Sequence, residues 1–156
     1  TIHYESNIDI ESNIKYILKG SVNNNEVNYK LIANNDFVES VILTQTLTFK
    51  SDVRKLAHTI SNSIYQNITN IKGIFTTKIA YIVQHGRNYK IIISDYDGYN
   101  QKVIFSSSYP ITSLSWNNTG KQISYVSFES GKPVVYVQDI HHAKRYKVAN
   151  YDGSNS

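Results

Sequence analysis

Apolar and polar residues alternate along most of this chain with a period of two, the pattern that predicts β-strands. In the first part, the alternation predicts strands over residues 13–22, 26–33 and 41–49. The first two are separated by three consecutive asparagines at residues 23–25, and asparagine tolerates the left-handed backbone angles of tight turns. We therefore expect a hairpin followed by a third strand.

One segment changes the period from two to between three and four, which predicts a helix. Its apolar positions form a single stripe: Val53, Leu56, Ala57, Ile60, Ile64 and Ile68. Ser51 is expected to cap this helix, because its hydroxyl can accept from the free N–H groups of the first turn, with Asp52 inside that turn. The helix should end between Asn67 and Gly73, and its apolar stripe should lie on the three strands.

From Thr76 onward the pattern predicts short strands only, joined by turns rich in glycine, asparagine and aspartate. They are expected over residues 78–83, 89–95, 101–106, 111–116, 122–127, 133–139 and 144–149. This part also repeats itself at an offset of 44 residues, since 79–83 (IAYIV) recurs as 123–127 (ISYVS) and 93–95 (ISD) as 137–139 (VQD). Repeats of this length with several short strands are typical of β-propeller blades, which commonly serve as docking platforms.

Charge and composition exclude several classes of function. The net charge of +4 would suit a nucleic-acid or acidic-lipid ligand, but the 16 basic residues are dispersed rather than gathered into a block, which favours an ordinary solvated surface. There is no cysteine, and no apolar run long enough to cross a membrane. We therefore expect neither nucleic-acid binding nor membrane insertion.

A search for catalytic and ligand-binding motifs returns nothing. The chain has no G-x-S-x-G elbow, no G-x-G-x-x-G and no P-loop. His141 and His142 are a weak metal candidate, because adjacent residues of a regular strand point to opposite faces. The sequence accordingly predicts no catalytic residue, no cofactor and no metal.

Two stretches resemble a known family. Residues 115–126 (SWNNTGKQISYV) resemble the W-S-P-D-G-K-x-I-A-Y-V signature of TolB-type propeller repeats, keeping Trp116, Gly120 and Lys121 but departing from it at 117–119. Residues 56–82 resemble the passage that joins the two domains of that family. The likeness therefore links a segment outside the repeats to the repeats in the right order.

The resemblance implies an α+β amino-terminal domain at residues 1–75, with a mixed sheet and a packed helix. Residues 76–156 would then be the first two blades of a six-bladed, all-β propeller. It also implies that the sequence is a fragment, with the start of the first domain and about four blades outside it. The function implied is that of a non-catalytic periplasmic scaffold in the Tol–Pal system of envelope integrity and cell division. Such a scaffold binds the lipoprotein Pal through its propeller, TolA through a segment absent here, and colicins.

Three groups of residues are expected to matter. Propellers bind partners on the loops between one blade and the next, which here are Ser108, Tyr109, Pro110 and Ser154. The resemblance places a domain junction at His58, Phe75 and Tyr81. For His58 two readings stay open, a hydrogen bond that orients the domains and a solvated helix residue. The blade core is expected to contain Trp116, Gly120 and Tyr125, although stacking on a ligand is a weaker alternative for the tryptophan.

Two further expectations concern the whole chain. The alternative to a TolB-like scaffold is the propeller portion of a serine peptidase, or another propeller-type binding protein. The first predicted blade begins at Lys78 without an inner strand, so we expect open strand edges and a tendency to self-associate.

Overall fold

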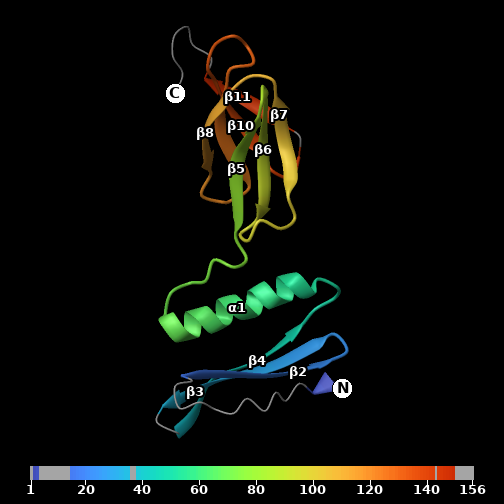
Figure 1. Ribbon diagram of the computed structural model, residues 1–156, viewed down its shortest axis with the longest axis vertical. Helices are drawn as coiled ribbons and strands as arrows, with labels where there is room; N and C mark the ends of the chain where they lie inside the picture. The colour runs from blue at the N-terminus through green and yellow to red at the C-terminus, as the bar shows by residue number, and fades with distance from the viewer. Residues whose placement is uncertain (1, 4–14, 36–37, 143, 150–156) are drawn as a thin grey trace. The chain divides into compact units, whose positions relative to one another are not determined.

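The computed structural model describes residues 2–3, 15–35, 38–142 and 144–149. The chain divides into two compact units, Thr1–Thr76 and Thr77–Ser156, here called the first and the second unit. Each unit has its own hydrophobic core. Both can be followed in Figure 1.

The first unit contains an antiparallel sheet with the strand order β1-β2-β3-β4. Its strands are β1 (Ile2–His3), β2 (Tyr16–Asn23), β3 (Glu26–Asn35) and β4 (Val38–Thr48). The hairpin between β2 and β3 is confirmed, and Asn24 in its turn has the expected positive φ of 52°. The sheet was expected to be mixed, but every described strand pair in it is antiparallel. For β2 and β3 the reason is the two-residue turn between them, which can join only antiparallel strands.

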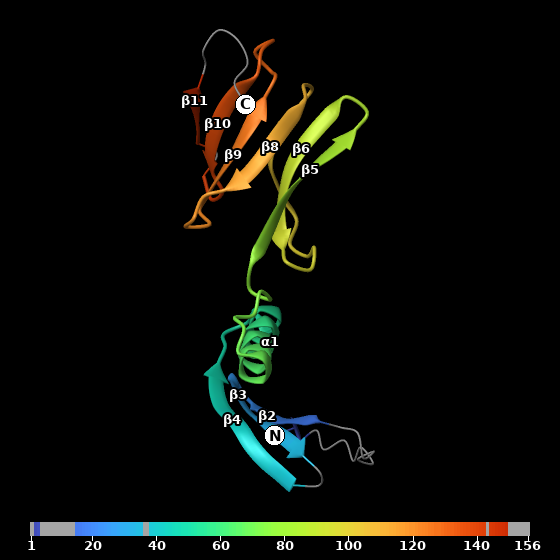
Figure 2. The same cartoon turned by 90° about the vertical axis from the view of Figure 1, so that its left-hand side faces the viewer.

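The helix α1 (Val53–Thr69) covers one face of this sheet, as Figures 1 and 2 show. The core between them contains Val27, Tyr29 and Leu56, with Leu43, Leu47, Phe49, Ile60 and Ile64 packed around these. The predicted helix and its packing on the sheet are therefore confirmed. The buried stripe is narrower than the sequence pattern, since Val53 is 61% exposed and Ala57 is also exposed.

The residue that caps α1 is Asp52, so the prediction of Ser51 was wrong by one position. The carboxylate of Asp52 accepts a hydrogen bond of 2.8 Å from the backbone N–H of Lys55. Both residue types are good caps, and the start of the helix decides between them. At the other end Asn70 adopts a φ of 57°, and its N–H donates to the carbonyl of Gln66.

The second unit contains two antiparallel sheets. The three-stranded sheet has the order β5-β6-β7, with β5 (Lys78–His85), β6 (Asn88–Asp95) and β7 (Lys102–Ser107). The four-stranded sheet has the order β11-β10-β9-β8, with β8 (Ile111–Trp116), β9 (Gln122–Ser127), β10 (Val134–Asp139) and β11 (Arg145–Ala149). These seven strands confirm the seven predicted from the sequence.

The two sheets of the second unit lie side by side and share one core (Figure 2). The buried residues of this core are Ile91, Ile93, Ile111, Ile123, Tyr125, Val134, Tyr136 and Ile140. The 44-residue offset maps β5, β6 and β7 onto β9, β10 and β11, so each sheet holds one copy of the repeat. The strand β8 pairs with β9, and the described three-stranded sheet has no counterpart of it.

A bulge interrupts β8. Its pairing with β9 shifts register between Thr112 and Ser115, and Ser113 has a φ of 54°. A serine at positive φ is uncommon and costs free energy on the order of 1 kcal/mol. The bulge breaks the regular row of backbone groups along this strand.

Candidate protein-interaction site

Two loops of the second unit meet at the same end of its sheets. Residues 108–110 connect β7 to β8, and residues 128–133 connect β9 to β10. The pairing of Ile111 with Ser127 places both loops at this end, and the N–H of Phe128 donates to the carbonyl of Pro110 at 3.1 Å. We call the described residues 108–110 and 128–133 the loop end.

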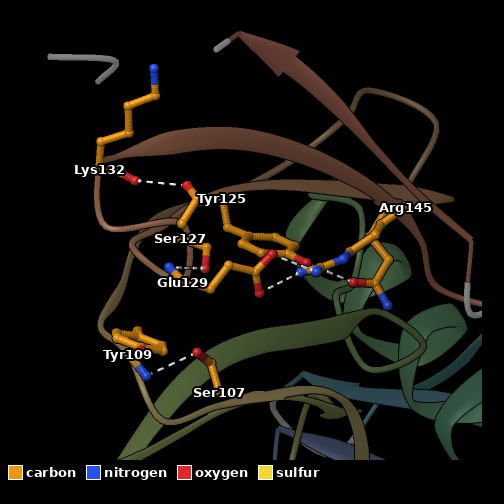
Figure 3. A network of polar contacts seen from close by, with 9 residues as sticks. Ser107, Tyr109, Tyr125, Ser127, Glu129, Lys132 and Arg145 are labelled. Carbon is orange, nitrogen blue, oxygen red and sulfur yellow. Dashed lines mark hydrogen bonds and ion pairs between the residues drawn. The ribbon is translucent and has the colours of Figure 1, made fainter. Parts of the chain in front are cut away.

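Tyr109 is the exposed aromatic side chain of the loop end. Its side chain is 52% exposed, and Ser108 and Pro110 on either side are exposed as well. The backbone N–H of Tyr109 donates to the hydroxyl of Ser107 at 2.9 Å, which fixes the start of the loop (Figure 3). The loop therefore presents a large amphipathic ring from a backbone that is already hydrogen bonded.

The neighbouring loop is held by its own hydrogen bonds. The N–H of Glu129 donates to the hydroxyl of Ser127, and the hydroxyl of Ser130 donates to the carbonyl of Lys132, each at 3.3 Å (Figure 3). The N–H of Gly131 donates to the carbonyl of Phe128 at 3.0 Å, and the φ of Gly131 is 79°, an angle that glycine adopts without strain. Hydrogen bonds within the loop thus hold it as a tight turn.

Glu129 of this loop forms a bidentate ion pair with Arg145 of β11 (Figure 3). The two guanidinium nitrogens lie 2.5 and 3.2 Å from the two carboxylate oxygens. The carbon of the same guanidinium lies 4.4 Å from the ring centres of both Phe105 and Tyr136. Because Phe105 belongs to β7, Arg145 joins the loop end to both sheets.

The ion pair changes the titration of its neighbours. Burial acts to raise the pKa of Glu129, but the hydrogen bonds from Arg145 and Tyr136 and the positive charges of Arg145 and Lys147 together outweigh it and hold that pKa below its ordinary value. Burial, together with the hydrogen bond to Glu129, raises the pKa of Tyr136 to about 12. At neutral pH the carboxylate is therefore charged and the phenol is neutral.

A second contact between the sheets runs through Gln138 of β10, which is 3% exposed. Its side-chain oxygen accepts from the hydroxyl of Tyr125, and its amide donates to the carbonyl of Ile104, both at 2.9 Å. The rings of Phe105, Tyr125 and Tyr136 stack in series, with centres 5.3 and 5.8 Å apart. The loop end thus rests on a rigid aromatic and polar support.

Sequence reasoning did not single out Glu129, Arg145 or Gln138. Gln138 left one signal, because it stands at an inward position of an alternating strand, where the pattern otherwise places Val134 and Tyr136. No sequence pattern pointed to Glu129 or Arg145, since their pairing depends on how β11 packs beside the loop.

Of the four residues expected to contact partners, Ser108, Tyr109 and Pro110 lie together and exposed at the loop end. Ser154 lies outside the described residues.

The junction residues divide between the units. His58 is half-buried on α1. Phe75 packs edge-on against Tyr65, and its N–H donates to the side chain of Asn62 at 2.9 Å, all within the first unit. Tyr81 lies half-buried on β5 in the second unit. Both readings of His58 stay predictions.

Of the residues expected in the blade core, Tyr125 is fully buried and Trp116 packs partly buried against the same core. Gly120 instead lies exposed in the turn before β9, with a φ of 66°. Residues with a side chain rarely adopt this backbone angle. The repeat signature therefore has a glycine at this position because of the angle and not because of packing.

The histidine pair lies in the turn between β10 and β11 and not in a strand, so the strand argument against chelation does not apply. The backbone N–H groups of His141 and His142 both donate to Asp139, and His142 Nδ1 lies 3.1 Å from the same carboxylate oxygen. Within residues 2–3, 15–35, 38–142 and 144–149, no group of three or more acidic or histidine side chains could hold a metal ion. In the part of the chain that the structure describes, no helix is long and apolar enough to cross a membrane.

Comparison with known proteins decides the family. Residues 65–156, more than half of the chain, match the family described as the TolB beta propeller domain. The chain belongs to the TolB propeller family. The predicted resemblance and the predicted fold class are thereby confirmed, apart from the mixed sheet expected in the first unit.

Curated relatives agree with this membership. The chain is 45% identical over 107 residues to the Tol-Pal system protein TolB of Bordetella pertussis, covering 69% of the chain and 24% of that relative. With the protein of the same name from Wigglesworthia glossinidia brevipalpis it shares 40% identity, covering 89% of the chain and 37% of the relative. The chain thus spans between about a quarter and somewhat over a third of the length of these TolB relatives.

A solved structure agrees as well. The crystal structure of TolB from Acinetobacter baumannii matches with a TM-score of 0.81 and 32% sequence identity, covering 90% of this chain and 37% of that one.

Proposed function

We propose that this chain is part of a non-catalytic scaffold of the Tol–Pal system, and that it binds the lipoprotein Pal through the loop end around Tyr109. The observation that carries the proposal is the match of residues 65–156 to the TolB propeller family. The relatives from both organisms are named Tol-Pal system protein TolB, which supports the assignment of this chain to that system. No such observation favours the serine-peptidase alternative.

The proposal includes several finer assignments. The chain acts in the periplasm, and its role is binding rather than catalysis. Residues 1–75 are the amino-terminal domain and 76–156 the first two blades. The whole protein binds TolA through a segment that is absent from this sequence, and colicins are further partners of the whole protein.

The geometry of the loop end supports a contact with a folded partner. Tyr109 is exposed, while hydrogen bonds to Ser107 and between Phe128 and Pro110 hold the backbone around it. A tyrosine offers a large contact area at a low entropic cost, and a pre-ordered loop loses little further freedom when a partner binds.

The test compares two tyrosines at opposite ends of the same sheets. Tyr109 is 52% exposed at the loop end, and Tyr99 is 57% exposed in the turn between β6 and β7. Binding of purified Pal to the 156-residue chain is measured by isothermal titration calorimetry for Tyr109→Ala and Tyr99→Ala. We expect Tyr109→Ala to weaken binding by about tenfold or more, as for an interface hot spot, and Tyr99→Ala to leave it within about twofold.

Two outcomes contradict the proposal differently. Equal binding by both variants removes the loop end as the contact while leaving Pal as a partner. Absence of binding by the unaltered chain removes Pal binding by these two blades.

A further inference from the structure

The chain passes from the first unit to the second between α1 and β5 (Figure 1). Connections between compact units are commonly flexible and rich in glycine or proline. Residues 70–77 contain no proline and a single glycine, Gly73, which is buried. The hydrogen bonds at both ends of this connection decide how much of it can move.

Asn62 of α1 binds the connection on the side of the first unit. Its side-chain oxygen accepts from the backbone N–H of Phe75 at 2.9 Å, and its side-chain nitrogen donates to the hydroxyl of Thr76 at 2.8 Å. The ring of Phe75 adds an edge-on contact with Tyr65 of the same helix, with ring centres 5.8 Å apart. One amide thus uses both its acceptor and its donor to hold two consecutive residues on α1.

Gly73 allows the connection to pass close to Asn62. A Cβ atom at residue 73 would lie 2.3 Å from the side-chain oxygen of Asn62 and 2.9 Å from its Cα. The position therefore requires glycine because of the close approach, and the connection lies directly against α1 at this point.

The second unit holds the chain from the next residue onward. The backbone N–H of Tyr96 donates to the carbonyl of Thr77 at 3.1 Å. Lys78 then begins β5 and pairs with Asp95 of β6, and its ammonium nitrogen lies 2.9 Å from that carboxylate. Thr76, bound within the first unit, and Thr77, bound within the second, are therefore consecutive residues.

We propose that Asn62 acts as a clamp that confines the hinge between the two units to the backbone bonds of Thr76 and Thr77. While the clamp is closed, rotation of one unit against the other can use only these bonds. The hinge is then a single peptide link rather than a linker.

Opening of the clamp lengthens the hinge. The chain is next held at Ile71, whose N–H donates to the hydroxyl of Thr69 at 3.1 Å, so residues 72–76 become free. Five extended residues reach up to about 17 Å, at about 3.4 Å each. The side chain of Asn62 thereby switches the connection between a tight hinge and a flexible linker.

The clamp can open reversibly, because water can replace both of its hydrogen bonds. Asn62 is half-buried and Thr76 is exposed. Two hydrogen bonds of ordinary strength favour the closed clamp by a factor on the order of 10 to 100. The closed form therefore predominates, and the open form stays accessible.

Backbone ¹⁵N relaxation measured by NMR on the 156-residue chain tests the inference. A rigid backbone has an order parameter of about 0.85, and a flexible one has a value below about 0.6. We expect rigid values at Phe75 and Thr76 in the unaltered chain and flexible values in Asn62→Ala. The two units of this variant should also tumble more independently, with shorter rotational correlation times.

The matched control is Asn67→Ala. Asn67 is an asparagine of the same helix, and its amide donates to the carbonyl of Ser63 inside α1. This substitution removes a hydrogen-bonded amide from the helix without touching the connection. We expect it to leave the order parameters of residues 72–77 unchanged.

Asn62→Asp provides a rescue. Its carboxylate keeps the acceptor for the N–H of Phe75 and can accept from the hydroxyl of Thr76 as well. We therefore expect the rigid values to return. A rescue of this kind separates the hydrogen-bonding role of Asn62 from a general loss of packing in α1.

Four results would overturn the inference. They are flexible values at Phe75 and Thr76 in the unaltered chain, rigid values in Asn62→Ala, an equal loss of order in Asn67→Ala, and a failure of Asn62→Asp to restore order. Circular dichroism at 222 nm verifies that α1 remains folded in each variant. If Asn62→Ala unfolds the first unit, Thr76→Val replaces it and should lower the order parameter of Thr76 alone, and an unchanged value there would equally overturn the inference.

Discussion

The strongest test of how the two sheets of the second unit are held together is the replacement of Arg145 by lysine. Lysine keeps the positive charge, but it lacks the flat fork that pairs with both oxygens of Glu129 and stacks between Phe105 and Tyr136. The substitution therefore removes the bidentate pairing and the stacking on the two rings while it preserves the positive charge.

The magnitude follows from the contacts. Each of the two ring contacts at 4.4 Å contributes about 0.5–1 kcal/mol when it is partly exposed to water. The loss of the second hydrogen bond to Glu129 adds roughly 0.5 kcal/mol, since the pair keeps some solvent exposure. We expect Arg145→Lys to lower the free energy of unfolding of the second unit by about 1.5–2.5 kcal/mol. Arg145→Ala should lower it by about 3 kcal/mol, because it also strips the carboxylate of its partner.

The assay can follow this unit separately. Trp116 is the only tryptophan of the chain and packs against the core of the second unit. Urea unfolding is monitored by its fluorescence at low protein concentration, so that association between copies does not contribute. Circular dichroism at 222 nm, which is dominated by α1, reports on the first unit and should not change.

A double-mutant cycle separates the ion pair from the stacking. Combining Arg145→Ala with Glu129→Gln should cost about 1 kcal/mol less than the sum of the two single changes, because the pair can be lost only once. A urea midpoint for Arg145→Lys equal to that of the unaltered chain would refute the argument from geometry.

Three further outcomes are expected. Asp52→Ala should destabilise the first unit by about 1 kcal/mol in urea followed at 222 nm, and Ser51→Ala by much less, because the aspartate carries the cap; equal losses would contradict this assignment. Gly73→Ala should destabilise the same unit by about 2 kcal/mol, since the new methyl group would lie 2.3 Å from the Oδ1 and 2.9 Å from the Cα of Asn62; a neutral result would mean that this approach is not close. The folded pKa of Tyr136 is raised from 10.0 to about 12, so the stability that depends on its neutral phenol is constant below pH 10 and is lost as pH rises toward 12. Relative to Tyr136→Phe, the unaltered chain should therefore lose stability more steeply between pH 10 and 12 in urea titrations, and parallel curves would be inconsistent with the shift.

Local patterns were sufficient to predict most of the fold. Strand alternation and turn residues are properties of neighbouring positions, so the seven strands from β5 to β11 and the hairpin of β2 and β3 were predicted correctly. The 44-residue repeat predicted from the sequence corresponds to the two sheets of the second unit, since it relates β5, β6 and β7 to β9, β10 and β11.

Features that depend on distant partners could not be predicted in this way. The roles of Glu129, Arg145 and Gln138 arise from strands that meet only when the sheets pack. The choice of Asp52 over Ser51 depends on where the helix starts, because the sequence offers two adjacent caps of similar quality.

The hydrogen bond from Gln138 to the carbonyl of Ile104 has a consequence for the order of folding. It spans 34 positions, whereas all described strand pairs of the second unit join strands that follow one another in the chain. Contacts between near neighbours form early, and contacts across a longer separation form after the loop between them has closed. Docking of the two sheets is then a late event, so weakening it should mainly speed unfolding and leave the refolding rate nearly unchanged.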